Sequence, residues 1–488
     1  MNDELLAQLG GPLGGAGLAV LVLAPTRYVR LAGLVGWAAG LALLVPVLAP
    51  AGEAPLLVAA AVAAVALAGA LGAVFVRWPW AVALVALAIS PVRVPVTVGE
   101  TSANLLLPLY AVVGGAAVAL GWALVRGDAR RRELGALAWP LALVVAWTCL
   151  SLAWSGDVES GATELFFFIL PFGVLAVAVA RLPWSPRALA LLFGVLLAMA
   201  AIFAAVGVWQ WATRDVFWNP KIIVANAYAP FYRVNSVFWD PSIYGRFLVL
   251  AILAAFVVIV FRALRSPRWE LVVGGAIVAA WIGLFVSFSQ SSFVALAAGV
   301  VAVAALAWRW RALAAVGLVA AVMIPVGVAA PQLDNVRDSV FGSSPSGVKR
   351  VTSGRWQRVV NGLRIAEDHP VAGVGVGAFK RTYAERLNRP PNRGGSVSHN
   401  SVVTAAAETG AVGLGLFAWL LVAAGMVAFR SLRSGGLPTK TRLVCGIGLG
   451  AIFVHSLFYG AFFEDPATWG LLALTALAAA AARLQEPA

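Results

Sequence analysis

The sequence predicts an all-α polytopic membrane protein, a bundle of about 14–15 transmembrane helices. The chain is 61% hydrophobic and only 11% charged, with a mean hydropathy of +0.91, which leaves too little charge to cover a soluble protein of this length. Apolar runs of roughly 17–25 residues, the length a helix needs to cross a bilayer, recur from end to end. The alternating short segments of a membrane β-barrel are absent from the sequence.

The expected spans follow these apolar runs, and Ala, Leu, Val and Gly dominate them, as is typical where helices pack closely in lipid. They cover residues 11–25, 31–50, 55–76, 78–92, 103–125, 135–154, 165–180, 188–212, 240–261, 270–288, 292–308, 312–330, 402–429, 443–462 and 467–483.

Short basic clusters alternate with acidic or weakly charged loops along most of the chain. Because short loops rich in Lys and Arg stay in the cytoplasm, this pattern predicts an N-terminus outside and a C-terminus inside. If the first run only lies on the membrane surface, the N-terminus moves inside. Met1-Asn2-Asp3-Glu4 lacks the basic start of a signal peptide, so we expect no cleavage there.

The chain divides into four expected parts. Residues 1–212 form N-terminal spans, and 213–330 form middle spans with a short outer loop at 213–239. Residues 331–401 form a large extracytoplasmic loop, and 402–488 form the C-terminal spans.

The large loop carries eleven basic residues against five acidic ones, a net charge of +6. Arginine on an outer membrane surface can hold two phosphate oxygens at once, so a diphosphate-linked lipid is one interpretation. General attraction to anionic headgroups is an equal alternative.

Residues 354–368 have helical spacing, with Trp356, Val359, Val360, Leu363 and Ala366 on one face. This pattern predicts either an amphipathic helix at the membrane interface or a packed helix of an external domain. In both cases Arg355 and Arg358 lie near the height of the headgroups.

The three histidines differ in context. His369 precedes Pro370, which favours a structural role at the end of a helix, and His455 is expected to hydrogen-bond to a neighbouring helix. His399 lies where the basic loop meets the next span, between the candidate caps Ser398 and Asn400. A histidine there can accept a proton from a sugar hydroxyl near neutral pH, although a structural role is the alternative.

Cys149 and Cys445 lie inside apolar runs and are expected to be buried thiols. No spacing typical of metal ligands occurs, so neither a metal nor another cofactor is expected.

The motif-bearing half of the chain, about residues 233–415, resembles the O-antigen ligase and polymerase family (WaaL-like and Wzy-like proteins). The resemblance runs from Gly354-Arg355-Trp356 through His369-Pro370 and Gly373-Val-Gly-Val-Gly-Ala-Phe379 to Ser398-His399-Asn400, with Glu408, Gly410, Gly413 and Gly415 following. Upstream, the stretch from Arg233 to Gly245, with Asp240 in its Trp-Asp-Pro segment, resembles another family motif.

The resemblance implies a GT-C-type fold in a bacterial plasma (inner) membrane, with an active site facing outward. It implies transfer of a glycan from a polyprenyl-diphosphate carrier to an acceptor hydroxyl of a glycan, lipid or protein, without nucleic acid or metal. Carried over by motif, the catalytic residues are His399, Arg355 and Arg233; the residues that bind diphosphate or glycan are Arg233, Arg355, Arg358, Gln290, Asn400 and Asp240.

One position departs from the family pattern. Where the family often has Ser-Arg at an outer turn, this chain has Phe288-Ser289-Gln290-Ser291-Ser292. Gln290 can donate a hydrogen bond but carries no charge, so we expect another cation to compensate or the donor to be recognised differently.

Two other functions share some of these features. A flippase or transporter of lipid-linked oligosaccharide is one alternative, although no convincing internal repeat links the two halves and most charges lie at span ends, with Arg246 the ambiguous case. A protein O-oligosaccharyltransferase is the other, because it shares the family motifs.

Overall fold

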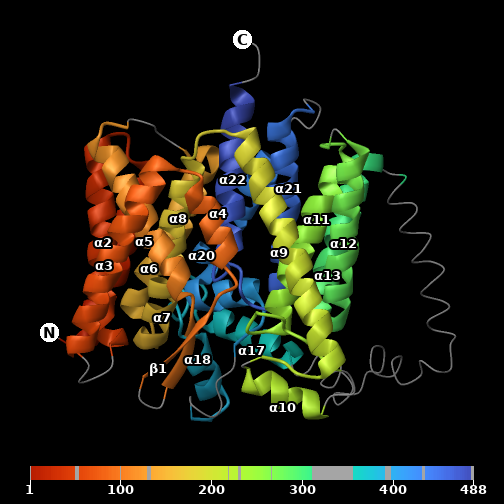
Figure 1. The fold of residues 1–488 in the computed structure, drawn as a ribbon. Helices are drawn as coiled ribbons and strands as arrows, with labels where there is room; N and C mark the ends of the chain where they lie inside the picture. Colours follow the sequence, from red (N-terminus) through yellow and green to blue (C-terminus); the bar gives the residue numbers. More distant parts are fainter. Residues whose placement is uncertain are drawn as a thin grey trace.

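The computed structural model describes residues 2–49, 54–98, 101–128, 133–217, 219–228, 232–264, 266–309, 311, 355–390, 397–430 and 435–484. Almost all of this chain is helical (Figure 1). The long helices are α1 (Asp3–Leu23), α2 (Arg27–Leu48), α3 (Ala54–Arg77), α5 (Leu107–Val125), α9 (Pro186–Thr213), α11 (Pro241–Val260), α12 (Pro267–Ser287), α13 (Gln290–Trp308), α20 (Ser401–Phe429), α21 (Leu437–Ser456) and α22 (Pro466–Arg483).

Shorter elements complete the fold. The segments η1 (Gly135–Leu137), α6 (Ala138–Leu150) and η2 (Ser151–Trp154) form one continuous rod, and α7 (Val158–Glu164), η3 (Leu165–Ile169) and α8 (Leu170–Ala180) form a second. The remaining elements are α4 (Ala81–Ile89), α10 (Pro220–Tyr228), α17 (Arg355–Asp368), α18 (Phe379–Arg386) and the antiparallel hairpin of β1 (Val94–Val98) and β2 (Thr101–Leu105), in which Val96 pairs with Ala103.

The prediction of a helical membrane bundle is confirmed. Within the described residues, eleven helices are long and apolar enough to cross a membrane, and each matches an expected span. The expected spans 55–76 and 467–483 correspond to α3 and α22, which are helical but fall outside those eleven. The expected span 312–330 lies outside the described residues.

The prediction of a full span at 78–92 is wrong. Helix α4 has only nine residues, about 13 Å at 1.5 Å per residue. Pro79 separates it from α3, and the chain leaves the helix at Ser90 and Pro91 to enter the β hairpin. The hairpin also takes the first residues of the expected span 103–125, so that helix α5 begins only at Leu107.

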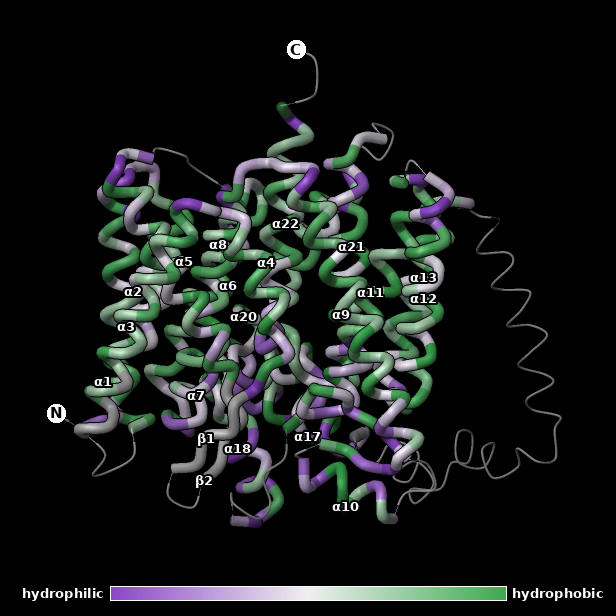
Figure 2. The backbone as a smooth tube through the Cα atoms, viewed as in Figure 1, coloured by the Kyte–Doolittle hydropathy of each residue, from purple (hydrophilic) through white to green (hydrophobic). Residues whose placement is uncertain are grey.

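The helices pack around two hydrophobic cores. One core joins α1, α2, α5, α6 and α8 to α20 and α22, and includes Leu170 and Trp469. The other joins α9, α11, α12, α13 and α21, and includes Tyr244 and Leu284. Hydrophobic residues dominate the middle of the helices, and hydrophilic residues gather towards both ends (Figure 2), as expected for a bundle in a bilayer.

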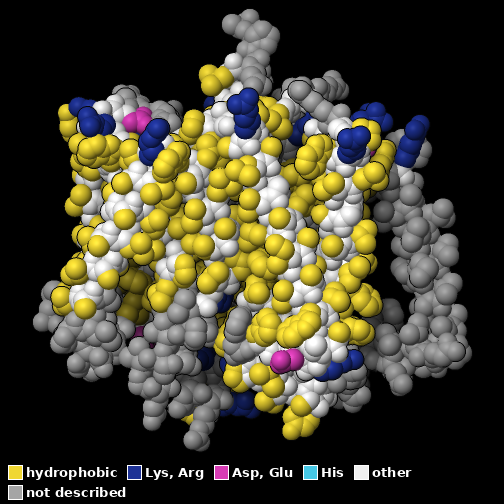
Figure 3. Space-filling view, viewed as in Figure 1, with side chains coloured by type: hydrophobic (Ala, Val, Ile, Leu, Met, Phe, Trp, Pro, Cys, Tyr) yellow, Lys and Arg dark blue, Asp and Glu magenta, His cyan; other side chains and the backbone are white. Residues whose placement is uncertain are grey.

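The two ends of the bundle differ. One end carries the hairpin, α10, α17 and α18, and we call it the loop face (Figure 1). The chain's N-terminus lies at this face and its C-terminus at the opposite one. In the view of Figure 3, Lys and Arg side chains line the rim of the opposite face.

Candidate functional site

The glycine-rich motif stabilises a break in helix α20. Gly410 interrupts the helix with φ 64°, and Gly373, Gly375 and Gly377 also have positive φ. The motif backbone binds the carbonyls freed at this break: Val374 N–H donates to Ala407 O (2.9 Å) and Gly375 N–H to Glu408 O (2.9 Å). The motif therefore shapes the helix that begins beside His399.

The close backbone approach explains why glycine recurs at alternate positions. A Cβ at Gly373 would lie 2.3 Å from Glu408 C, and one at Gly375 would lie 2.3 Å from Ser155 Cα. No L side chain fits at such distances, and positive φ adds strain.

Helix α17 packs on the start of α20. A Cβ at Gly362 would lie 2.4 Å from Val403 Cγ1, and Ile365 is buried with Val403 and Ala407. Trp356 and Leu363, expected on the same apolar face, are instead exposed. Gly362 packs against Val403, and the later Gly373 packs against Glu408, so this segment and the start of α20 advance in the same direction. The end of α17 at Arg355 therefore lies towards His399.

His399 directly precedes the N-cap of α20. Its backbone is left-handed, with φ 57°, and its side chain is half-buried. Asn400 caps the helix, because its Oδ1 accepts hydrogen bonds from Val402 N–H (3.0 Å) and Val403 N–H (3.1 Å). The Asn400 amide also donates to Leu457 O (3.1 Å), which ties His399 to the connection between α21 and α22.

That connection, residues 457–465, is the centre of the site. A Cβ at Gly460 would lie 3.4 Å from His399 Cα. From the other side, Arg246 of α11 pairs with Asp465 (Nε–Oδ2 2.6 Å) and donates to Ala461 O (3.0 Å). Its guanidinium also lies 5.9 Å from the ring centre of Tyr459. Loop 457–465 therefore links His399 to a buried arginine.

Arg233 reaches the same loop from the segment before α11. Its main chain exchanges two hydrogen bonds with the Asn226 amide of α10 (2.8 and 3.0 Å), and its Nε donates to Ser287 O (3.3 Å). Partial burial lowers the pKa of Arg233, while Asp240 and Tyr459 act in the opposite direction. Arg233 thus lies within electrostatic reach of Tyr459.

Gln290 follows the turn that contacts Arg233, but its side chain carries no charge and so does not replace the arginine of the family pattern. Gln290 is the first residue of α13 and is exposed. The preceding turn holds Ser287, the acceptor for Arg233. Behind it, Ser291 hydrogen-bonds to His455 (3.0 Å), which confirms the expected contact of His455 with a neighbouring helix.

Arg93 is a third arginine near Tyr459, and the motifs did not indicate it. It lies between α4 and β1 and is half-buried. Burial lowers its pKa, with opposing effects from Tyr459, Tyr110 and Asp465 and a further lowering from Arg246. Arg93 therefore lies within electrostatic reach of the same loop and of the Arg246–Asp465 ion pair.

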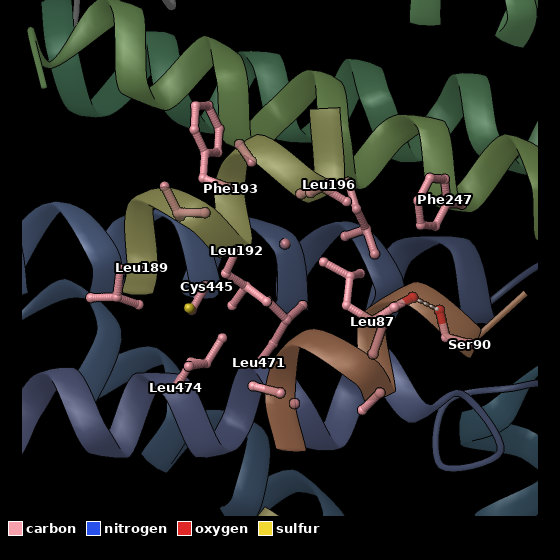
Figure 4. Close-up of a pocket in the computed structure, with 18 of the residues that line it drawn as sticks. Leu87, Ser90, Leu189, Leu192, Phe193, Leu196, Phe247, Cys445, Leu471 and Leu474 are labelled. Carbon is pink, nitrogen blue, oxygen red and sulfur yellow. Dashed lines mark hydrogen bonds between the residues drawn. The ribbon is translucent and has the colours of Figure 1, made fainter. Parts of the chain in front are cut away.

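A cavity of about 870 Å³ extends from this cluster along the bundle. Arg93, Arg246 and Asp465 line its end at the loop face, and Arg187, Arg262 and Lys440 line the end near the opposite face. Apolar residues, many of them leucine, form most of the wall between them, with Leu189, Leu192 and Leu196 of α9 across from Leu471 and Leu474 of α22 (Figure 4). The cavity therefore offers a long apolar surface with a charged end.

The structure brings four of the candidate residues together near one loop. His399, Asn400, Arg233 and Asp240 lie close to loop 457–465, whereas the side chain of Arg355 lies outside the described residues. Arg358 is half-buried in α17. Sequence reasoning missed the loop itself, although its run of aromatic and acidic residues between two spans was the available signal.

Fold and site together define a polytopic membrane protein with a basic site at one face of the helical bundle. Residues 275–418 match the family model described as O-antigen ligase. No curated protein matches the chain. The matched range contains Gln290, the glycine motif, His399 and the break in α20, but neither Arg93 nor Arg246 nor loop 457–465.

Proposed function

We propose that this protein is a membrane glycosyltransferase of the polysaccharide ligase or polymerase type. It moves a glycan from a polyprenyl-diphosphate carrier to an acceptor hydroxyl at the extracytoplasmic face of a bacterial plasma membrane. The match of residues 275–418 to the O-antigen ligase family model supports this class of activity. Glycans, lipids and proteins all offer a hydroxyl that could serve as the acceptor.

The observation that carries the proposal is an apolar cavity that ends beside arginines, at a loop whose Gly460 packs against His399. Its leucine-lined wall suits a prenyl chain, and the arginine end suits phosphate groups. Loop 457–465 connects that end to His399 through Gly460 and Leu457. The cavity wall, the arginine end and His399 thus offer neighbouring sites for the lipid, the anionic leaving group and the proton transfer.

The charge distribution favours an extracytoplasmic loop face. Arg27, Arg126, Arg187 and Arg262 lie at helix ends on the opposite face, and short basic connections stay in the cytoplasm. The loop face would then open towards the periplasm or cell exterior, where carrier-linked glycans present their sugars.

The proposed reaction needs one proton acceptor and one stabilised leaving group. His399 takes the proton from the acceptor hydroxyl while its oxygen attacks the anomeric carbon of the carrier-linked sugar. The bond from that carbon to the phosphate oxygen breaks, and its electron pair leaves with the polyprenyl diphosphate. Arg233 and Arg355 stabilise the negative charge that develops on this leaving group. His399 then releases its proton to water.

The test is glycan transfer by purified protein in liposomes, with donor and acceptor on one side. We expect His399→Ala to lower the rate by roughly 10²–10⁴-fold, the usual contribution of general acid–base catalysis. His369→Ala is the matched control, because His369 is exposed at the end of α17 and should leave transfer unchanged.

Three results distinguish the alternatives. Full activity of His399→Ala would remove this residue from the reaction. Movement of the donor across the bilayer without transfer would identify a flippase. Transfer only to a protein acceptor would identify an oligosaccharyltransferase.

A further inference from the structure

The cavity has a second charged end, near the face opposite to the loop face, and we call it the Lys440 end. Arg187, Arg262 and Lys440 line the cavity there. Arg187 is the second residue of α9, Arg262 follows the end of α11, and Lys440 lies near the start of α21. Segments far apart in the sequence therefore bring three cations to one end of the cavity.

The described carboxylates do not neutralise these cations. None of the ion pairs among the described residues includes Arg187, Arg262 or Lys440, and Lys440 Nζ donates instead to the main-chain oxygen of Arg262 (3.0 Å). The carboxylates among the described lining residues are Glu464 and Asp465, which lie at the loop-face end. The Lys440 end therefore keeps a positive charge that the cavity wall does not balance.

Arginines elsewhere on the same face are engaged by aromatic rings. The guanidinium carbon of Arg126 lies 4.7 Å from the ring centre of Trp122, and that of Arg77 lies 5.9 Å from the ring centre of Trp78. Neither arginine lines the cavity. The cations of the Lys440 end thus differ from these neighbours, because they lie where polar surface meets an apolar cavity.

Two helix N-termini add to the positive potential at this end. Helices α9 and α21 both begin here, and their first residues, Pro186 and Leu437, line the cavity. The N-terminus of a helix carries a partial positive charge. Further in, the wall becomes apolar, and Leu189 lies near Cys445 and Leu474 (Figure 4). Cations beside an apolar cavity match the polarity of an anionic lipid.

We propose that the Lys440 end binds an anionic phospholipid from the membrane leaflet at the face opposite to the loop face. The lipid phosphate lies at the three cations, and an acyl chain lies against Leu189, Leu264 and Val444, which line the cavity. A zwitterionic head group would bring its own ammonium group towards the same cations, so a head group of net negative charge is favoured.

This site does not depend on the proposed function. A prenyl chain would enter the cavity from the loop face, and the phospholipid from the opposite face, so the two lipids occupy opposite ends of one cavity. The phospholipid is therefore expected to bind in the absence of any glycan donor.

The experiment uses the full-length protein in phosphatidylcholine nanodiscs. The probe is phosphatidylglycerol with a photoactivatable diazirine on one acyl chain, and phosphatidylcholine with the same chain is the reference. Mass spectrometry of the cross-linked peptides locates the acyl chain. The test variant is Arg187→Gln/Arg262→Gln/Lys440→Gln, and Lys440→Gln alone is a milder variant that removes one charge.

The matched control is Arg27→Gln/Arg77→Gln/Arg126→Gln. It removes the same charge from the same face, at helix ends that do not line the cavity. It therefore separates a defined site from the general attraction between basic residues and anionic lipid.

We expect the wild type to cross-link phosphatidylglycerol in preference to phosphatidylcholine, at peptides that contain Leu189 or Val444. The triple test variant should lose this preference roughly tenfold or more, because each basic residue near the membrane surface adds to the attraction of anionic lipid. Lys440→Gln should lose part of the preference, and the control variant should keep it.

Three outcomes would overturn the assignment. An unchanged preference in the folded test variants would exclude these cations from lipid binding. Equal loss in the control variant would leave only general surface attraction. Displacement of the probe by glycerol 3-phosphate, which has the head-group phosphate but no acyl chain, would assign the cations to a soluble phosphate compound. None of these results depends on glycan transfer, so the proposed function would be unaffected.

Discussion

Arg246 shows how a single buried charge can organise this site. Its guanidinium binds Asp465 and the Ala461 carbonyl, which lie at two points of loop 457–465. Both charges are shielded from water, so each depends on the other for compensation. Removing one partner leaves an unpaired buried charge, which is far costlier than losing an exposed ion pair.

Arg246→Ala should therefore destabilise the protein by about 3–5 kcal/mol. Arg381→Ala breaks the exposed pair with Glu385, whose side chains are 51% and 56% exposed, and should have little effect. Thermal unfolding in detergent measures both. Equal stability of the two variants would show that the Arg246 pair is not a structural anchor.

Glu464 gives the stability a dependence on pH. Burial raises its pKa from 4.5 to about 7, so the folded state holds a proton that the unfolded state releases between these values. Protonated Glu464 therefore adds to the free energy of unfolding. This contribution is fully present below pH 4.5 and is lost as the pH rises towards 7. The Glu464→Gln variant should lose less stability than the wild type between pH 5 and 8, measured as the difference in melting temperature. Parallel curves would exclude this titration.

The residue-level site could be predicted only in part. His399, Asn400 and Arg233 lie in motifs, and the structure places all three beside loop 457–465. Arg93 lies about 150 residues before Arg246 in a region without a motif. Only the fold, in which both arginines line one cavity, makes them neighbours. Sequence spacing contains no information on such long-range contacts.

At the scale of elements, the broken helix α20 is the main feature. Its break at Gly410 is compensated by hydrogen bonds with the segment that holds the glycine motif, where Ala411 N–H donates to Pro370 O (2.8 Å). Buried backbone groups need such partners, which gives the motif a structural purpose next to the site. The break lies about ten residues after His399 along the same helix.

Gly410→Ala should lower stability and activity together, because a Cβ there would lie 2.2 Å from Val371 O at a positive φ. The strain alone is worth roughly 1–3 kcal/mol. Gly415→Ala in the same helix meets nothing within 4 Å and should be tolerated. Melting temperature and transfer rate are the measurements, and equal tolerance of both substitutions would contradict the proposed role of the break.

The membrane-spanning helices were predicted well wherever hydropathy alone determines the structure. Eleven expected spans are helices of membrane-crossing length. The misjudged span, residues 78–92, is as apolar as its neighbours, but Pro79 and Pro91 interrupt it. Proline ends helices and favours extended backbone before it, so local backbone geometry overrides hydropathy there.

At the scale of the whole molecule, the cavity separates two bundles that each have a core. Helices α4 and α22 contribute from the first bundle, and α9, α11 and α21 from the second. A cavity in this position can be filled without disturbing either core. Substitutions in its apolar middle and at its charged end can therefore test the two parts of the site separately.

Gly470→Trp should block the cavity while the fold persists. Gly470 lines the cavity, and nothing lies within 4 Å of a Cβ added there. We expect the KM for the carrier-linked donor to rise at least about tenfold, because the indole competes with the prenyl chain for apolar contacts. Gly450→Trp is the matched control, since Gly450 is exposed on α21 and equally unobstructed. Equal kinetics of both variants would place the prenyl chain elsewhere.

The shortness of α4 has a kinetic consequence. Nine residues cover less than half of a hydrocarbon layer about 30 Å thick, so α4 does not continue on the loop-face side of Ser90, where the described chain enters the β hairpin. A carrier could then enter sideways, without passing through water. Turnover would follow the mole fraction of carrier among the surrounding lipids, and adding inert lipid at constant total donor should slow the reaction.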